Sequence, residues 1–375
     1  MRRLGMIMAL CAMLAVAAGW PVVGSARAAA GPSWGEVQQF GICDSRGVQA
    51  VTATSATNAW ATGQWSNFIG GDCPAETLLI AQNDGAPSEW RILQPPAGYA
   101  SYTGLAVATL NASYAWFFAY DSFSSTSPPA ALLRQNGRWR AFQLASGALI
   151  DSAVAFSQSN VWAFGSRPSS TGAVPYAVHF NGQRWSTVSI PVLPQACSST
   201  APDIWAVGPL ASASGQPIPQ PYALAHWTGS QWHTIAFPHL GLPSGEGVDR
   251  AWVVRDTAQG AWIAGDVGSQ SNPNVGGVLL HWTGSSWVSV TIPFQTGGLG
   301  PLSQDGNGGV WINNGAEMAD YNAGQWAQVP IAVDSSSELS QVTAMRLIPQ
   351  TQSVWASGSI ITHETNQGVM LEGGL

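Results

Sequence analysis

The 375-residue sequence predicts an all-β protein built from a repeated unit, and three observations lead to this fold class. Short alternating strands carry tryptophan at a recurring position, tight turns such as Asn-Gly join the strands into hairpins, and the first of these tryptophans recurs every 43 to 57 residues. Repeats of this length with four short strands each are typical of a β-propeller. We therefore predict a seven-bladed β-propeller with four-stranded antiparallel blades.

The first repeated element is a strand that carries tryptophan, then a small residue and often glycine. SNVWAFG (159–165) and PDIWAVG (202–208) are examples. The tryptophan occurs seven times, at Trp60, Trp116, Trp162, Trp205, Trp262, Trp311 and Trp355. Seven copies predict seven blades, each with a large apolar side chain for packing against the next sheet.

A hairpin with a second tryptophan follows each of the first six copies. LAHWTGSQWHTIAFP (224–238) and LLHWTGSSWVSVTIP (279–293) show how closely the repeats resemble each other. His179, His226 and His281 share one position just before the turn. A catalytic residue need not recur in every unit, so we interpret these histidines as structural.

The seventh unit lacks its last strand, and the N-terminal segment supplies a match for it. The chain stops at GVMLEGGL, whereas GPSWGEVQQF (31–40) has the pattern of the missing strand. We predict that 31–40 completes the last blade and closes the ring, which removes free sheet edges. The predicted single domain is 29–375, with blades at approximately 41–98, 99–147, 148–193, 194–240, 241–295, 296–332 and 333–375.

Residues 1–28 have the layout of a secretory signal peptide. Two arginines precede an apolar run from Leu4 to about Trp20, and an A-x-A pattern ends at Ala28. Cleavage there predicts a secreted, extracellular protein with no membrane insertion afterwards. An uncleaved anchor is the alternative, because the apolar run approaches the length of a membrane span.

The low content of charged residues and the negative net charge limit the classes of molecule that the protein can bind. Charged residues make up 9% of the chain, and all 13 basic residues are arginines. The sequence after residue 28 contains 10 basic and 20 acidic residues, so its net charge is about −10. Nucleic acid and anionic membrane surfaces are excluded because no basic stripe exists. We expect a monomer whose partner is an extracellular protein or a glycan.

Three cysteines follow residue 28, so at most one internal disulfide can form. Cys43 is expected in the loop that enters the first inner strand, and Cys73 in the loop between that unit's second and third strands. Both loops would lie on one face. We predict that Cys43 and Cys73 pair after export and that Cys197 stays free and buried on an inner strand.

The stretches SNVWAFG and PDIWAVG, with the hairpins ending at Trp185, Trp232 and Trp287, resemble the tryptophan-rich propeller repeats of secreted actinobacterial proteins. These repeats are grouped with the kelch/galactose-oxidase type of propeller. The resemblance spans nearly the whole chain after residue 28, more weakly in units 1, 2 and 6. It implies the fold and export but no particular activity. The copper-ligand set of galactose oxidase is not recognisable, and we expect no cofactor and no metal.

Two sets of residues are candidates for a binding site on one face. The long loops between second and third strands carry apolar contacts on a scaffold suited to recognition, namely Trp65, Phe68 and Phe123. Charged residues recur where inner strands begin and would ring the mouth of the channel, namely Asp44, Arg46, Asp151, Asp249 and Arg250. The alternative for both sets is solvated loop residues without a ligand.

Three functional hypotheses follow from these features. The first is a secreted, non-enzymatic propeller that recognises a protein or glycan through loops on one face. The second is a carbohydrate-active hydrolase or lyase that uses carboxylates at the channel mouth, and the third is an envelope-associated scaffold. Trp65 is the single residue we favour for binding, because no other unit carries tryptophan at its position.

Overall fold

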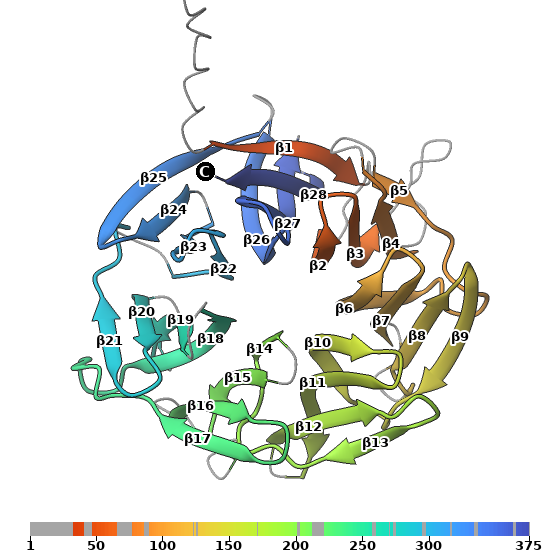
Figure 1. The fold of residues 1–375 in the computed structure, drawn as a ribbon, viewed down its shortest axis with the longest axis horizontal. Helices are drawn as coiled ribbons and strands as arrows, with labels where there is room; N and C mark the ends of the chain where they lie inside the picture. Colours follow the sequence, from red (N-terminus) through yellow and green to blue (C-terminus); the bar gives the residue numbers. More distant parts are fainter. Residues whose placement is uncertain are drawn as a thin grey trace, which may run out of the picture. The chain divides into compact units, whose positions relative to one another are not determined.

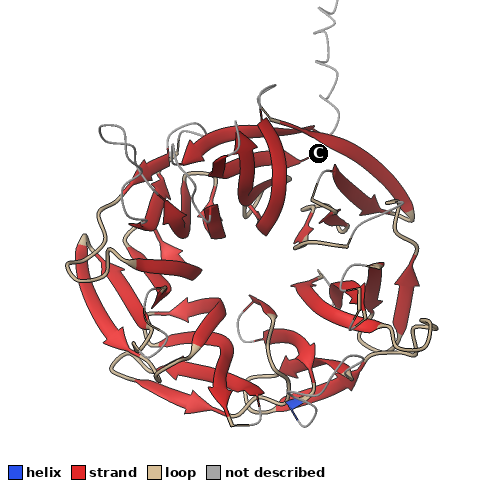
Figure 2. Cartoon of the chain, turned by 180° about the vertical axis from the view of Figure 1, so that it is seen from behind, coloured by secondary structure: helices blue, strands red, loops and turns tan. Residues whose placement is uncertain are grey.

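The structure is a computed structural model that describes most of the unit Pro32–Leu375. The described residues are 33–40, 47–65, 77–85, 90–122, 124, 127–170, 172–200, 203–211, 221–256, 260–269, 271–272, 275–294, 298–315, 317–333, 337–362 and 365–374. Strands surround a central opening in this unit, as seen from one side (Figure 1) and from behind (Figure 2).

Units 1 to 5 are four-stranded antiparallel sheets whose strands follow one another in chain order. The first strand of each unit lies nearest the central opening and is called the inner strand (Figure 1). The strands are, unit by unit, β2 Gly47–Ser55, β3 Asn58–Trp65, β4 Thr77–Asn83 and β5 Trp90–Ile92; β6 Tyr102–Asn111, β7 Tyr114–Asp121, β8 Ala130–Gln135 and β9 Arg138–Gln143; β10 Leu149–Ser157, β11 Asn160–Ser169, β12 Gly172–Phe180 and β13 Trp185–Val188; β14 Ala196–Thr200, β15 Asp203–Pro209, β16 Tyr222–Trp227 and β17 Trp232–Ala236; β18 Gly247–Arg255, β19 Ala261–Gly268, β20 Gly276–Trp282 and β21 Trp287–Val290.

The remaining strands form one eight-stranded sheet in the order β22-β23-β24-β25-β1-β28-β27-β26. Unit 6 contains β22 Ser303–Gln304, β23 Val310–Asn313, β24 Glu317–Asn322 and β25 Gln325–Ala332; unit 7 contains β26 Ser337–Leu347, β27 Ser353–Thr362 and β28 Thr365–Gly374. The N-terminal strand β1 (Ser33–Phe40) pairs antiparallel with β28 along its length and parallel with the end of β25. The first described strand of the chain therefore lies beside the last one.

The repeated tryptophans hold neighbouring units together. The seven tryptophans of the second strands are at most 6% exposed. In three places a tryptophan of an outermost strand contacts the second-strand tryptophan of the preceding unit edge to face, with ring centroids 5.1 Å apart for Trp185–Trp116 and for Trp90–Trp355, and 5.3 Å apart for Trp34–Trp311. Each such pair contributes about 0.5–1.5 kcal/mol beyond the burial of apolar area. In the last pair, Trp34 of β1 occupies the place of a fourth-strand tryptophan.

The glycine of the repeated Trp-x-x-Gly motif lies on the second strand of a unit and allows the backbone of the inner strand to approach the second strand closely. A Cβ atom at Gly165 would lie 1.8 Å from the carbonyl oxygen of Leu149, and one at Gly208 would lie 1.8 Å from that of Leu193. Opposite Gly165, the pairing of β10 with β11 shifts register between Ile150 and Ser152. The motif glycine therefore makes room for a β-bulge in the inner strand, because no side chain could fit there.

Candidate functional site

In four units, a β-bulge places one residue of the inner strand in the lining of a common cavity. Register shifts leave Gln49 of β2, Leu105 of β6, Asp151 of β10, and Thr343 of β26 outside the regular pairing. All four line one cavity of about 500 Å³. Because a bulge turns a side chain away from its normal direction, the same local feature builds this cavity from several units. We call this cavity the channel mouth.

The channel mouth is lined by residues from all seven units. Most of its polar groups are amides and hydroxyls, which come from Gln49, Ser152, Gln195, Gln341 and Thr343. Trp252 of β18 is half-buried and is the aromatic residue among the described lining. Asp151 and Arg250 supply the charges. A concave surface with one aromatic ring and several planar hydrogen-bonding groups is suited to a small polar ligand.

Two carboxyl groups near the channel mouth have raised pKa values. Asp151 is solvent-accessible within the cavity, but protein surrounds it on most sides, and this desolvation raises its pKa to about 7 against the opposing effect of Arg250. Desolvation also raises the pKa of Asp266 of β19 to about 6, and the Asp249 carboxylate adds to the effect. Both groups therefore change charge near neutral pH.

Arg250 is the positive charge among these carboxylates. Its guanidinium lies 5.7 Å from the ring centroid of Trp252, within the range of a cation–π contact. Within the described residues it has no ion pair shorter than 4.0 Å. The guanidinium therefore keeps donors that a ligand could use.

Residues of unit 4 fix the backbone that carries Arg250. The Gln195 side chain accepts the N–H of Ala251 at 2.8 Å and donates to the carbonyl of Asp249 at 3.1 Å. The Tyr222 hydroxyl donates to the same carbonyl. Burial raises the pKa of Tyr222, so its hydroxyl keeps its proton at neutral pH. These bonds across the unit boundary hold the bulge at Asp249 in one position.

A second hollow lies between units 2 and 3, next to the connections from β7 to β8 and from β11 to β12. It has a volume of about 600 Å³. Its lining includes Tyr120, Ser127, Leu149 and Pro168. Leu149 is 39% exposed, so this groove offers apolar surface to a partner.

The structure brings together three residues of the predicted charged ring, Asp151, Asp249 and Arg250. Asp266 and Trp252 were missed, although a charge directly after the motif glycine at Gly265 was a signal for Asp266. Outside the described residues lie Asp44, Arg46, Phe68, Phe123, Cys43 and Cys73. Trp65 is the last residue of β3, and its side chain is outside the described part.

The prediction for Cys197 was right about its strand and its free thiol but wrong about its burial. Cys197 lies on the inner strand β14 and is half-buried, because it packs against the core between units 3 and 4 at the point where this core borders the channel mouth. Desolvation raises the pKa of its thiol.

Neither a metal cluster nor a membrane-spanning helix is found in the described residues. They hold no group of three or more His, Cys, Asp or Glu side chains arranged for a metal ion. Within the same residues, no helix has the length and apolar character needed to cross a membrane.

Comparison with known proteins supports the fold. No family model matches the chain, and no curated protein matches it. Among solved structures, YCF48 bound to D1 peptide is 14% identical with a TM-score of 0.58. The match covers 92% of this chain and 95% of the YCF48 chain. The β-propeller domain of the Trilobed protease from Pyrococcus furiosus is 10% identical with a TM-score of 0.54, over 87% of this chain and 94% of that chain.

A third similar structure is the GH74 enzyme of Niastella koreensis, which is 13% identical with a TM-score of 0.53. The match covers 89% of this chain and 54% of the enzyme. The chain is therefore an all-β protein with the β-propeller fold, built from about seven four-stranded units. Propellers with this likeness include a peptide-binding protein and a glycoside hydrolase, so the fold by itself does not decide the function.

Proposed function

We propose that the protein is a secreted, non-enzymatic binding propeller that recognises a glycan at its channel mouth. The lining of this cavity carries the proposal. Sugar rings present apolar faces and many hydroxyl groups, which match the half-buried ring of Trp252 and the amides of Gln49 and Gln341. A concave cavity of about 500 Å³ suits an oligosaccharide better than a flat protein surface.

We propose further that the seven units form a ring closed by β1. Three features support closure: β1 pairs with β28, Trp34 contacts Trp311 as fourth-strand tryptophans do elsewhere, and the inner strands β26 and β2 contact each other. The layout of residues 1–28 supports export. The resemblance of the repeats to kelch-type propellers of secreted bacterial proteins agrees with both proposals. A monomer is expected, because closure removes free sheet edges.

A glycan panel with the Trp252→Ala variant tests the proposed binding. We expect the wild type to bind one glycan class and the variant to bind it about tenfold or more weakly, because ring stacking and apolar burial are lost. Trp139→Ala is the matched control, since Trp139 is a half-buried tryptophan on the outer strand β9. Equal affinities of wild type and Trp252→Ala for every glycan that binds would contradict the proposal.

A carbohydrate-active hydrolase or lyase is the second candidate, and the raised pKa of Asp151 favours it. A carboxyl group with a pKa of about 7 can act as a general acid or base at neutral pH. Prolonged incubation with the bound glycan, followed by product analysis, separates the two functions. Products that disappear with Asp151→Asn would make the protein an enzyme, whereas a binding protein returns its ligand unchanged.

A further inference from the structure

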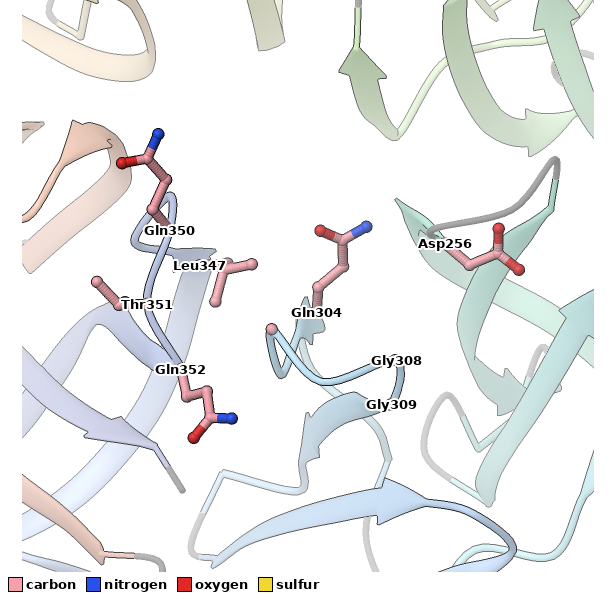
Figure 3. A pocket seen from close by; sticks show the side chains of 9 residues that line it. Asp256, Gln304, Gly308, Gly309, Leu347, Gln350, Thr351 and Gln352 are labelled. Atoms are coloured by element: carbon pink, nitrogen blue, oxygen red, sulfur yellow. The ribbon is translucent and has the colours of Figure 1, made fainter.

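The channel mouth continues into two further cavities. A middle cavity of about 350 Å³ shares Cys197, Val253, Leu302 and Met345 with the mouth. A third cavity of about 640 Å³ shares Gln304 and Leu347 with the middle one, and Figure 3 shows these residues with Asp256 and the turn at 350–352. The three cavities follow the inner strands from one end to the other.

The middle cavity contains an arginine without a partner. Arg346 of β26 is half-buried and lines the cavity. Its guanidinium has no hydrogen bond and no ion pair within the described residues. Desolvation lowers its pKa, but an arginine stays charged at physiological pH. The guanidinium is open to the cavity, so its five N–H donors are available to an anionic ligand.

The other arginine of this cavity differs, because protein groups already engage it. The Arg255 guanidinium forms an ion pair with the Asp203 carboxylate, with Nη2 3.8 Å from the carboxylate oxygen. The backbone of Arg255 is also fixed, because its N–H donates to Ser198 at 3.0 Å and its carbonyl accepts from Gln304. The middle cavity therefore has one positive charge without an ion pair in the described residues, and Ser198, Ser303 and Gln304 also line it. At the mouth, in contrast, Arg250 shares the lining with Asp151, and Asp249 and Asp266 are nearby.

We infer that Arg346 binds an anionic group of the ligand, and we propose the carboxylate of an acidic sugar residue. This inference rests on the proposed function and specifies its ligand as a glycan that contains uronic acid. One guanidinium matches one carboxylate in charge and in planar, bidentate geometry. The neutral residues of the same glycan would occupy the channel mouth beside Trp252.

Calorimetric titration with an aldotriouronic acid, a trisaccharide with one uronic acid and two neutral sugar residues, and with its carboxyl-reduced, neutral counterpart tests the inference. We expect the wild type to bind the acidic trisaccharide about 10- to 100-fold more tightly, the range of a charge-assisted hydrogen-bonded pair. Arg346→Gln should lose this preference and bind the neutral trisaccharide as the wild type does. Arg184→Gln, which removes the same charge from an exposed turn, should keep the preference.

Thermal melting checks the fold of the variants. Arg346→Gln should melt no lower than the wild type, because no ion pair is lost with it. Arg346→Lys retains the charge but not the bidentate geometry, so it should show an intermediate preference and provides the test if the glutamine variant fails to fold.

The outcomes separate the two proposals. Equal binding of both trisaccharides, with loss in Trp252→Ala, would overturn the acidic-sugar inference and leave the proposed function in place. An unchanged preference in Arg346→Gln would also overturn the inference. Competition by inorganic sulfate that depends on Arg346 and exceeds that of galacturonate would overturn the assignment of a carboxylate. Binding of no saccharide at all would overturn both proposals.

Discussion

Asp320 should make the protein less stable as the pH rises, and its substitution by asparagine should remove that loss. Asp320 lies on β24 opposite Trp311, in the register position that His226 occupies opposite Trp205 in unit 4. Its side chain is 4% exposed, and its Oδ1 has no hydrogen-bond partner in the described structure. Desolvation, with a contribution from the nearby Asp305, raises its pKa to about 7.

The magnitude follows from proton linkage. The folded state keeps a proton on Asp320 up to about pH 7, whereas the unfolded chain releases it near 3.8. The folded state therefore binds more protons within this window, and the free energy of unfolding falls as pH rises through it. The window covers about three pH units at 1.36 kcal/mol each, so the loss at pH 8 is at most about 4 kcal/mol.

Denaturant unfolding of wild type and Asp320→Asn at pH 4, 6 and 8 measures this loss. The difference between the two proteins isolates Asp320, because Asp151 and Asp266 contribute equally to both. We expect the variant to gain stability over wild type steadily from pH 4 to pH 8. Asp84→Asn is the matched control, since Asp84 is exposed and forms a surface ion pair with Arg91 at 3.6 Å. Parallel pH profiles for wild type and Asp320→Asn would refute the reasoning.

Four further predictions concern closure, the disulfide, the loop face and the bulge. Deleting 33–40 should lower the melting temperature and cause association through the open edge; an unchanged melt and a monomeric elution would contradict closure. Mass mapping of non-reduced digests should find Cys43 bridged to Cys73, a loop of about 30 residues worth on the order of 3–4 kcal/mol, and any other pairing would contradict this. If a ligand binds at the loop face rather than at the channel mouth, Trp65→Ala should abolish its binding with little change in melting temperature, whereas a large stability loss with intact affinity would make Trp65 structural. Gly165→Ala should destabilise the fold, because its Cβ would lie 1.8 Å from a backbone oxygen; a melt like that of the wild type would contradict the close approach.

The strands were predictable from the sequence because their signals are local. A tryptophan such as Trp162 within an alternating run, followed by an Asn-Gly turn at 181–182, specifies a hairpin without knowledge of the rest of the chain. The structural interpretation of the repeated histidines fits their contacts. His226 stacks on Trp205 with centroids 3.8 Å apart, and His281 stacks on Trp262 at 4.0 Å and bonds Asp256 at 2.7 Å.

The site was predictable only where its residues recur at one repeat position. Asp151 and Asp249 could be placed at the channel mouth because both precede the same strand pattern. Trp252 and Arg346 could not, since their exposure to the channel depends on the register of long inner strands. A shift of one residue reverses the face of every side chain that follows. The motif glycine marks where a bulge can form, but it does not give the register of the inner strand on either side of the bulge.

The bulges also explain how a protein made of copies can carry a site that is not repeated. The motif glycine gives the inner strand room to bulge, and the bulge turns one side chain toward the channel. Packing between sheets constrains the tryptophan and the glycine, whereas the bulge residue differs from unit to unit. Gln49, Leu105, Asp151 and Thr343 hold this position in four units and all line the channel mouth. Because each unit contributes a different group to one cavity, the channel mouth can recognise a ligand that has no symmetry.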